Sequence, residues 1–194
     1  MKEISKFELR KRELFKQVNV LIQKEGFDSL TVRKICKELG ISTGTFYHYF
    51  TEKGDIAWIL FSDMDWYFDS DVVIKFTDNE INNLIEYSVG YARYVINNGI
   101  EAARYISLAP FKNRNNEYFA EDRSVYQVLL KVIERGQYKE QFISSVTSTE
   151  LARMVLVLLR GYFSDWAKRS GSYDLIFEVD KFIRIFIVSI KNNV

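Results

Sequence analysis

The 194-residue chain has few of the residues that interrupt or cross-link a fold. It contains one proline, nine glycines, one cysteine and one histidine. A single cysteine excludes an internal disulfide and fits a reducing compartment. The sequence also lacks a sustained alternating strand pattern, an internal repeat, and any run of about 18 apolar residues that could cross a membrane. With so few helix breakers, long segments of apolar residues at helical spacing predict an almost entirely helical protein.

The chain also lacks the short motifs that identify common enzymes. There is no HExxH, CxxC, GxSxG or phosphate-binding loop. Cys36 and His48 alone cannot build the common metal sites or a cysteine–histidine pair. The stretch 63–71 contains four aspartates, but their spacing fits no calcium-binding loop, and we interpret them as solvated residues at a helix end. We therefore expect a protein that is not an enzyme and needs no cofactor or metal.

Charge is distributed unevenly along the chain. Residues 1–53 contain 11 lysines and arginines against 7 acidic residues, whereas residues 54–194 contain 16 against 19. An imbalance of this size is common in solvated helices, but the positive excess falls on the segment that carries the main motif, as nucleic-acid contact would require. The N-terminal residues are charged and form no apolar signal region, so we expect a cytoplasmic protein that is not secreted and has no membrane partner.

Residues 26–53 have the pattern of a helix-turn-helix. Thr31 is a typical N-cap for a helix whose apolar residues recur at helical spacing, and Gly40 ends that helix because the turn needs a backbone that tolerates positive φ. Ser42 or Thr43 then caps a short second helix over residues 45–50. This second helix carries hydroxyls and flat amphipathic rings, which suit phosphates and base edges in a major groove.

This block resembles the DNA-binding segment of the TetR family of one-component bacterial regulators. The resemblance is carried by GF at 26–27, LTV at 30–32, GIS at 40–42, and the run FYHYF at 46–50 with a lysine at 53. A generic helix-turn-helix does not carry that aromatic run followed by a lysine. The block covers roughly the first quarter of the chain, and the remainder matches the family only in length and helical texture.

The resemblance implies a fold, a domain organisation and a function. The implied fold is all-α, with an N-terminal three-helix helix-turn-helix domain over residues 1–52 and a C-terminal helical bundle for ligand binding and dimerisation over residues 53–194, about nine helices in total. The implied function is that of a sequence-specific transcription regulator, a repressor whose binding to a palindromic operator in double-stranded DNA is released by a small-molecule effector. The alternative is a nucleoid-type protein that binds DNA with little sequence preference and responds to no effector.

The same resemblance places eight residues at the DNA. Thr31 and Lys53 would hold phosphates, and Gly44 would let the backbone approach the duplex closely. Thr45 and Tyr47 are expected to reach base edges. The full set is Thr31, Thr43, Gly44, Thr45, Tyr47, His48, Tyr49 and Lys53.

Each aromatic or charged member of this set has a plainer alternative. Tyr47 and Tyr49 could instead occupy the domain core with satisfied hydroxyls. His48 and Lys53 could be solvated side chains that touch no DNA. The two phenylalanines that flank the aromatic run are expected to pack inside the domain.

Further helices are expected over residues 5–25, about 52–69, 80–97, 100–108, 118–135, 151–169 and 174–192. Thr77 and Thr147 have the spacing of capping boxes and should begin two of these helices. Pro110 and Gly136 should end two others.

The regulatory half is rich in aromatic residues, and the resemblance implies a ligand cavity inside its helical bundle. A cavity lined by aromatic rings and a few polar groups would suit an aromatic or lipophilic effector. The residues predicted to line it are Tyr87, Tyr91, Tyr94, Arg104, Tyr126, Tyr162 and Trp166. For each aromatic residue the alternative is an ordinary position in the core.

The last two helices are more apolar than burial on one side requires. Their surplus apolar surface faces either the domain centre or a partner, and the family pairs these helices with those of a second copy. We therefore expect a homodimer that buries at least ~1,000 Å². The predicted interface residues are Leu151, Val155, Leu158, Tyr162, Ile183, Phe186, Ile187 and Ile190.

Overall fold

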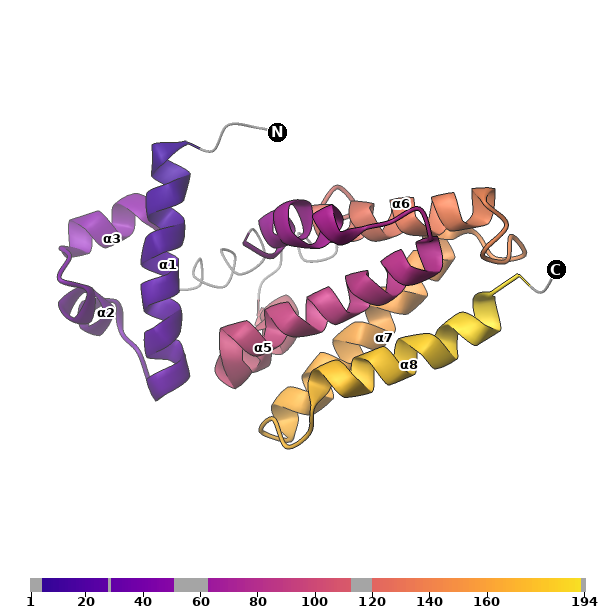
Figure 1. Ribbon diagram of the computed structural model, residues 1–194. Helices are drawn as coiled ribbons and strands as arrows, with labels where there is room; N and C mark the ends of the chain where they lie inside the picture. The colour runs from indigo at the N-terminus through magenta and orange to yellow at the C-terminus, as the bar shows by residue number, and fades with distance from the viewer. Residues whose placement is uncertain (1–4, 28, 51–62, 113–119, 193–194) are drawn as a thin grey trace.

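A computed structural model describes residues 5–27, 29–50, 63–112 and 120–192. Within these ranges the architecture is helical, and extended segments pair only at one isolated bridge between Phe142 and Lys191. The predicted all-α fold is therefore confirmed. Three helices lie together at the N-terminal end and the others form a separate bundle (Figure 1). The predicted boundary between residues 52 and 53 lies outside the described residues, as does Lys53.

The N-terminal group, which we call the reader, consists of α1 (Lys6–Glu25), α2 (Val32–Leu39) and α3 (Thr43–Tyr49). Its helices surround a core of buried side chains that also includes one residue of the bundle. These residues are Leu14, Phe15, Val18, Ile22, Leu30, Ile35, Cys36, Phe46, Phe50 and Ala102. Burial raises the pKa of the Cys36 thiol, so this cysteine remains a protonated core residue at neutral pH.

The turn between α2 and α3 follows the sequence signals closely. The Thr31 hydroxyl accepts a hydrogen bond from the Lys34 amide at 3.2 Å, which confirms Thr31 as the N-cap of α2. Gly40 ends α2 with φ 64°, in the left-handed region. Ser42 rather than Thr43 caps the second helix, so α3 begins at Thr43, two residues earlier than predicted.

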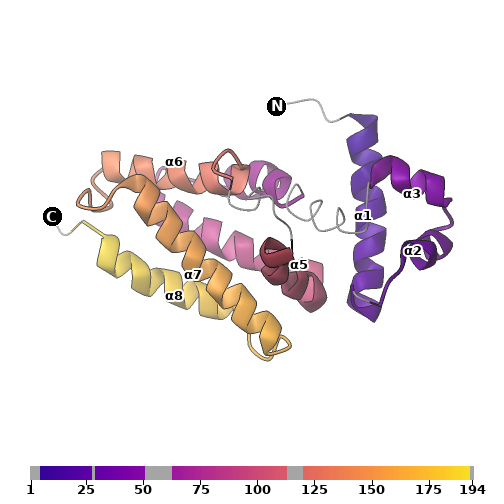
Figure 2. The same ribbon diagram turned by 180° about the vertical axis from the view of Figure 1, so that it is seen from behind.

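The first described residues of the bundle, 63–67, are helical and are followed by a π-helical turn η1 (Phe68–Val72) and a 3-10 turn η2 (Val73–Lys75). The longer helices are α5 (Glu80–Lys112), α6 (Ser124–Tyr138), α7 (Ser148–Lys168) and α8 (Leu175–Ile190). Seen from behind, α7 runs between α6 and α8 (Figure 2). No described helix is long and apolar enough to cross a membrane.

Two predicted helix ends in the bundle are wrong, for different reasons. Asn79, not Thr77, caps α5, because its side-chain oxygen accepts from the Asn82 amide at 3.0 Å. Gly136 lies inside α6 instead of ending it. A Cβ there would lie 2.0 Å from the Phe142 ring, so the glycine makes room for a packed aromatic side chain.

The other two predicted ends show one correction and one confirmation. The backbone of α5 bends at Gly99, where φ is 83°, and then continues past Pro110 to Lys112. The predicted stop at Pro110 is therefore two residues early. The capping box at Thr147 is confirmed, with Glu150 bonding back to the Thr147 amide.

Glu80 is a buried acid that ties the start of α5 to the end of α6. Its side chain is 1% exposed and accepts hydrogen bonds from Asn83 Nδ2 at 2.8 Å and from Lys139 Nζ at 2.9 Å. Arg135 forms an ion pair with it at 3.1 Å. Burial disfavours the carboxylate, but these hydrogen bonds and the Arg135 charge outweigh burial and hold the pKa of Glu80 below its ordinary value.

Glu80→Gln should remove a pH-dependent part of the stability. Because the folded-state pKa is lower than the unfolded one, the stabilisation is present above the ordinary glutamate pKa and is lost as the pH falls through the folded value. We expect the free energy of unfolding at pH 7 to drop by about 1 kcal/mol and its acid dependence to flatten. Urea unfolding from pH 7 to pH 4 measures both. Glu134→Gln, at an exposed position of α6, is the control, and an equal loss in both variants would contradict the role of Glu80.

Candidate nucleic-acid interface

Helix α3 presents one buried side and one exposed side. Phe46 is fully buried and its ring lies 4.9 Å from that of Phe50. On the other side, Thr43, Gly44, Thr45, Tyr47 and His48 are exposed, while Tyr49 is half-buried against the reader core. The structure therefore gathers six of the eight predicted DNA contacts on one short helix, and its outward face carries hydroxyls and rings.

The leading edge of α3 is held in place by its own cap. The Thr45 amide donates to Ser42 Oγ at 2.9 Å, and the hydroxyls of these two residues lie 2.9 Å apart. A Cβ on Gly44 would make only ordinary contact, 3.6 Å from Ser42 Oγ. Packing within the protein therefore does not require a glycine at position 44. A binding partner that comes close to the backbone at this point would explain why the residue is glycine.

An aromatic residue from α1, which the sequence did not single out, supports the exposed rings. Phe7 stacks on Tyr49, with ring centroids 4.9 Å apart and an interplanar angle of 28°. It also meets the edge of His48, at 5.4 Å and 85°. These contacts fix two of the predicted DNA residues on the surface. The only sequence signal was an apolar residue at the exposed start of a charged helix.

Thr31 lies at the start of α2, on the exposed surface of the reader. Its hydroxyl caps the helix, and the residue is exposed. Three cationic residues of α2, Arg33, Lys34 and Lys37, are exposed as well, and Lys34 pairs with Glu25. A helix start with capped geometry beside cations is suited to a phosphate.

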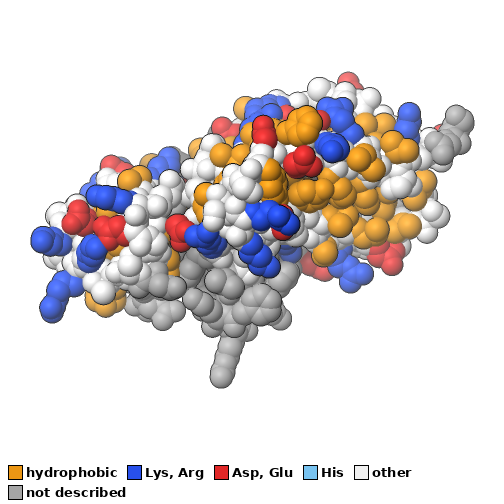
Figure 3. All heavy atoms as spheres, turned by 90° about the horizontal axis from the view of Figure 1, so that it is seen from below, with side chains coloured by type: hydrophobic (Ala, Val, Ile, Leu, Met, Phe, Trp, Pro, Cys, Tyr) orange, Lys and Arg blue, Asp and Glu red, His pale blue; other side chains and the backbone are white. Residues whose placement is uncertain are grey.

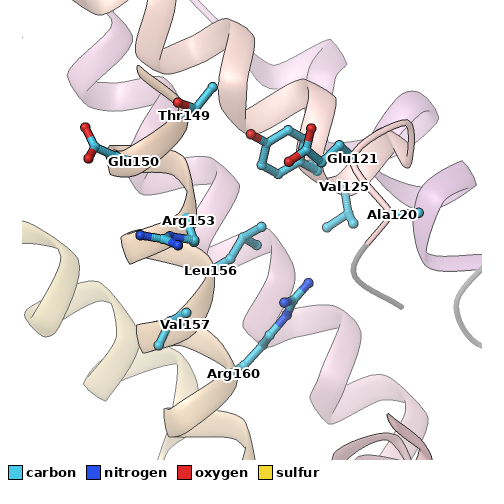
Figure 4. A pocket seen from close by; sticks show the side chains of 10 residues that line it. Ala120, Glu121, Val125, Thr149, Glu150, Arg153, Leu156, Val157 and Arg160 are labelled. Atoms are coloured by element: carbon cyan, nitrogen blue, oxygen red, sulfur yellow. The ribbon is translucent and has the colours of Figure 1, made fainter. Parts of the chain in front are cut away.

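In the bundle, a cavity of about 620 Å³ lies between α6 and α7. Its lining residues are Ala120, Glu121, Val125, Tyr126, Thr149, Glu150, Arg153, Leu156, Val157 and Arg160. Figure 4 shows Arg160 reaching from α7 toward Val125 of α6. The lining thus combines apolar walls with charged groups of both signs.

Of the residues predicted to line a ligand cavity, only Tyr126 lies here. Tyr87, Tyr91 and Tyr94 are buried in the bundle core, and Tyr87 donates its hydroxyl to the Val125 carbonyl at 2.6 Å. Arg153 and Arg160 line this cavity but were not among the residues predicted to do so, although Arg160 interrupts an otherwise apolar run. Aromatic content alone did not distinguish core from cavity.

The other predicted ligand residues lie in two further places. Arg104 and Trp166 line a shallower hollow of about 520 Å³ between α1, the kink of α5 and the end of α7. Tyr162 lies between the last two helices, 5.2 Å from the ring of Phe182.

An apolar surface remains uncovered on α7 and α8, and we call it the outer face. Figure 3 shows hydrophobic side chains gathered on the bundle side of the molecule. The exposed apolar residues of these helices are Met154, Val157, Leu158, Phe177, Ile185 and Val188. A Cβ at Gly161 would meet nothing within 4 Å, so the protomer gives no reason for a helix-weakening glycine there.

The predicted dimer residues divide between the inside and the outside of the protomer. Leu151, Val155, Ile183, Ile187 and Ile190 are buried in the protomer's own core, where α7 packs against α5 and α6 and α8 packs mainly against α5. Leu158 is exposed, and Tyr162 and Phe186 are half-buried. An interface on these helices would therefore be formed by the outer face and not by the strongest apolar stripe.

Comparisons with known proteins agree with this architecture. Residues 19–57 match the family described as bacterial regulatory proteins, tetR family, which confirms the resemblance. No curated protein matches the chain.

Solved structures match over nearly the whole chain. The fatty acid degradation regulator FadR from Bacillus halodurans has a TM-score of 0.75 at 17% identity, covering 96% of this chain and 97% of that one. FadR from Bacillus subtilis, solved with stearoyl-CoA, has a TM-score of 0.73 at 19% identity, covering 92% and 97%. A TetR-family regulator from Pectobacterium atrosepticum has a TM-score of 0.75 at 9% identity, covering 99% of both chains. At these identities the matches establish the fold.

Proposed function

We propose that this chain, which carries the TetR-family helix-turn-helix at residues 19–57, is a dimeric, sequence-specific DNA-binding transcription regulator. The observation that carries the proposal is α3, whose inward Phe46 is fully buried while its outward row of hydroxyls and rings faces solvent. Thr43, Gly44, Thr45 and Tyr47 would enter the major groove. Thr31, His48, Tyr49 and Lys53 would hold the phosphate backbone that fixes the register.

Two copies would present two readers to one duplex. The outer face of α7 and α8 is the surface proposed to join them, since contiguous apolar side chains at helical spacing suit packing against the same helices of a second copy. Two recognition helices in successive major grooves require half-sites about 34–36 Å apart. The operator should then be a palindrome or nearly one.

A selection of binding sequences from random duplexes tests this function. A repressor-like regulator should enrich one two-fold symmetric site at fixed salt. A nucleoid-type protein should leave the pool without an enriched sequence, and that result would overturn the proposal.

We further propose that a small-molecule effector occupies the α6–α7 cavity and releases the DNA. A protein of this fold was solved with stearoyl-CoA, which supports a small-molecule effector here. The apolar walls and the nearby Arg153 and Arg160 suit a molecule with a lipophilic part and a polar end. For release, the effector must bind the DNA-incompetent state better, with a coupling of ~1–3 kcal/mol.

A thermal-shift screen tests the cavity. Compounds that raise the Tm of the protein should lose that effect in Tyr126→Ala, which removes a lining ring from α6. Tyr138→Ala is the matched control, because Tyr138 lies on the same helix and is 90% exposed. Hits that shift both variants equally would place the effector elsewhere.

Phe7→Ala should weaken DNA binding although it leaves the identity of every DNA-facing residue unchanged. The variant removes the ring that holds Tyr49 and His48 in place. Aromatic pairs are worth ~0.5–1.5 kcal/mol, so affinity for the selected operator should fall by roughly twofold to tenfold. Fluorescence anisotropy at fixed salt measures this change. Leu9→Ala, an exposed residue two positions along α1, should keep wild-type affinity, and equal affinity of both variants would rule out support by Phe7.

A further inference from the structure

A hollow of about 520 Å³ lies where the end of α1 meets the kink of α5 and the end of α7, and we call it the junction hollow. It is separate from the α6–α7 cavity, because the described residues that line the two have no member in common. We propose that the junction hollow is a second small-molecule site, which takes a primary amine carrying an apolar group. This site goes beyond the proposed function, since neither DNA nor the occupant of the α6–α7 cavity takes part in it.

The apolar walls of the junction hollow come from α5 and α7. Ile96 and Ile100 lie on either side of the kink at Gly99, and Trp166 lies in the last turn of α7. The indole of Trp166 is held in place, because its Nε1 donates to the Tyr173 carbonyl at 3.1 Å. These side chains form a fixed apolar surface against which the ring or chain of a ligand can pack.

Arg104 is the one cation among the described residues that line the hollow, and every nitrogen of its guanidinium already donates a hydrogen bond. Nε donates to the Ala167 carbonyl at 3.2 Å, and Nη2 donates to Ser170 Oγ at 2.8 Å. Nη1 forms an ion pair with Glu101 Oε1. An anionic ligand would compete with these partners, so the arginine does not make the hollow an anion site.

Two side-chain oxygens at the hollow accept no hydrogen bond from the described part of the chain. In Glu101, Oε1 is bonded to Arg104, whereas Oε2 is unfilled. In Gln23, on α1, Nε2 donates to the Asn98 carbonyl at 2.9 Å, and Oε1 is unfilled. A protonated amine has three N–H donors and no acceptor, so it is the head group that matches two free acceptors.

Glu101 also lies against the C-terminal end of α1. A Cβ on Gly26, the residue that ends this helix, would lie 3.7 Å from Glu101 Oε2. The C-terminal end of a helix carries partial negative charge, so a carboxylate is unfavourable there and a cation is favourable. Arg104 compensates the carboxylate at Oε1, and a cationic head group at Oε2 would complete the compensation.

The contact between α1 and α5 holds a further unfilled acceptor. Asn19 is 7% exposed and donates Nδ2 to Asn98 Oδ1 at 3.1 Å, but its Oδ1 has no hydrogen-bond partner among the residues that the structure describes. It lies one helical turn before Gln23, and both residues bond to Asn98. A buried acceptor without a donor costs free energy. The junction is therefore short of hydrogen-bond donors, in keeping with a ligand that donates.

An NMR titration of the full chain with benzylamine tests the site. The reporter is the indole N–H resonance of Trp166, one of three tryptophans, which Trp166→Phe assigns. Benzyl alcohol and benzoate are the neutral and anionic counterparts of this amine. We expect a saturable shift of the Trp166 resonance with benzylamine, weaker binding of benzyl alcohol, and no binding of benzoate.

Variants at the two free acceptors should weaken the binding of benzylamine. Glu101→Gln keeps the shape of the side chain and removes its charge, so the affinity should fall by roughly threefold to tenfold. Gln23→Ala, at an exposed position of α1, removes the second acceptor and should lower the affinity by a smaller factor.

Two control variants should keep wild-type affinity for benzylamine. Glu86→Gln is the matched control for Glu101, because Glu86 also lies on α5 and pairs with an arginine, Arg93, outside the hollow. Glu121→Gln neutralises an acid of the α6–α7 cavity. A loss of affinity in Glu121→Gln without one in Glu101→Gln would place the amine in that cavity and overturn the site.

Other results would overturn the site as well. These are the absence of a saturable Trp166 shift with benzylamine, equal or tighter binding of either counterpart, and unchanged affinity in Glu101→Gln. Should Glu101→Gln not fold, Gln23→Ala decides in its place. Because no step uses DNA, a wild type that selects no operator but binds benzylamine as expected would overturn the proposed function and leave this site intact.

Discussion

Val188→Glu is expected to convert the protein to a monomer and to abolish tight binding to a duplex with two half-sites. Val188 lies near the C-terminal end of α8 and, at 74% exposed, is the most exposed residue of the outer face. In a dimer that buries this face, each copy would bring an unpaired carboxylate into apolar surroundings. A monomer also loses the gain from tethering two readers, which is commonly ~10²–10⁴-fold.

Light scattering and anisotropy on the selected operator measure the two effects. Val20→Glu is the matched control for oligomeric state, because Val20 is an exposed valine of α1, outside the outer face. It should leave the dimer intact. A dimeric Val188→Glu protein, or a wild type that is monomeric at micromolar concentration, would contradict the proposed interface.

Phe46→Ala is expected to lose stability and Tyr47→Ala to lose operator binding, although the two residues are neighbours on α3. Phe46 is fully buried in the reader core, so its truncation should cost ~3–5 kcal/mol of stability. Tyr47 is 56% exposed, so its truncation should change stability by less than ~0.5 kcal/mol. Its loss should instead weaken operator binding by more than ~1 kcal/mol.

Urea unfolding and anisotropy at fixed salt separate the two outcomes. Tyr138→Ala, which truncates an exposed tyrosine far from the reader on α6, should change neither quantity. The assignment of α3 as the DNA-contacting helix would fail if Tyr47→Ala kept wild-type operator affinity. An unchanged unfolding curve for Phe46→Ala would contradict the description of the reader core.

The features that the sequence predicted well are those decided within a few residues. Thr31, Gly40 and Thr147 act on amides and turns next to them, so their types and positions were sufficient. Gly136 was wrongly predicted to end a helix. A glycine is needed there because the ring of Phe142, six residues further on, packs against the helix at that position. A packing contact that forms only when the chain folds leaves no signal in the residues next to the glycine.

The same distinction explains what was predicted of the sites. The exposed row on α3 followed from a local motif, whereas its support by Phe7 depends on how α1 crosses α3. The tyrosines of α5 had the composition expected of a cavity, but packing placed them in the core. Asp65 was interpreted as a solvated acid, but its carboxylate accepts a hydrogen bond from the Val125 amide at the start of α6, 60 residues away in the chain.

The central claim is that two readers, joined through the outer face of α7 and α8, bind two half-sites of one duplex. Its most direct test is to insert about five base pairs, half of a helical turn of about 10–10.5 base pairs, between the half-sites of the selected operator. The dimer should then lose most of its specific affinity, and insertion of about ten should restore a large part of it. Equal affinity for all three spacings would show that each reader binds alone and would contradict the account.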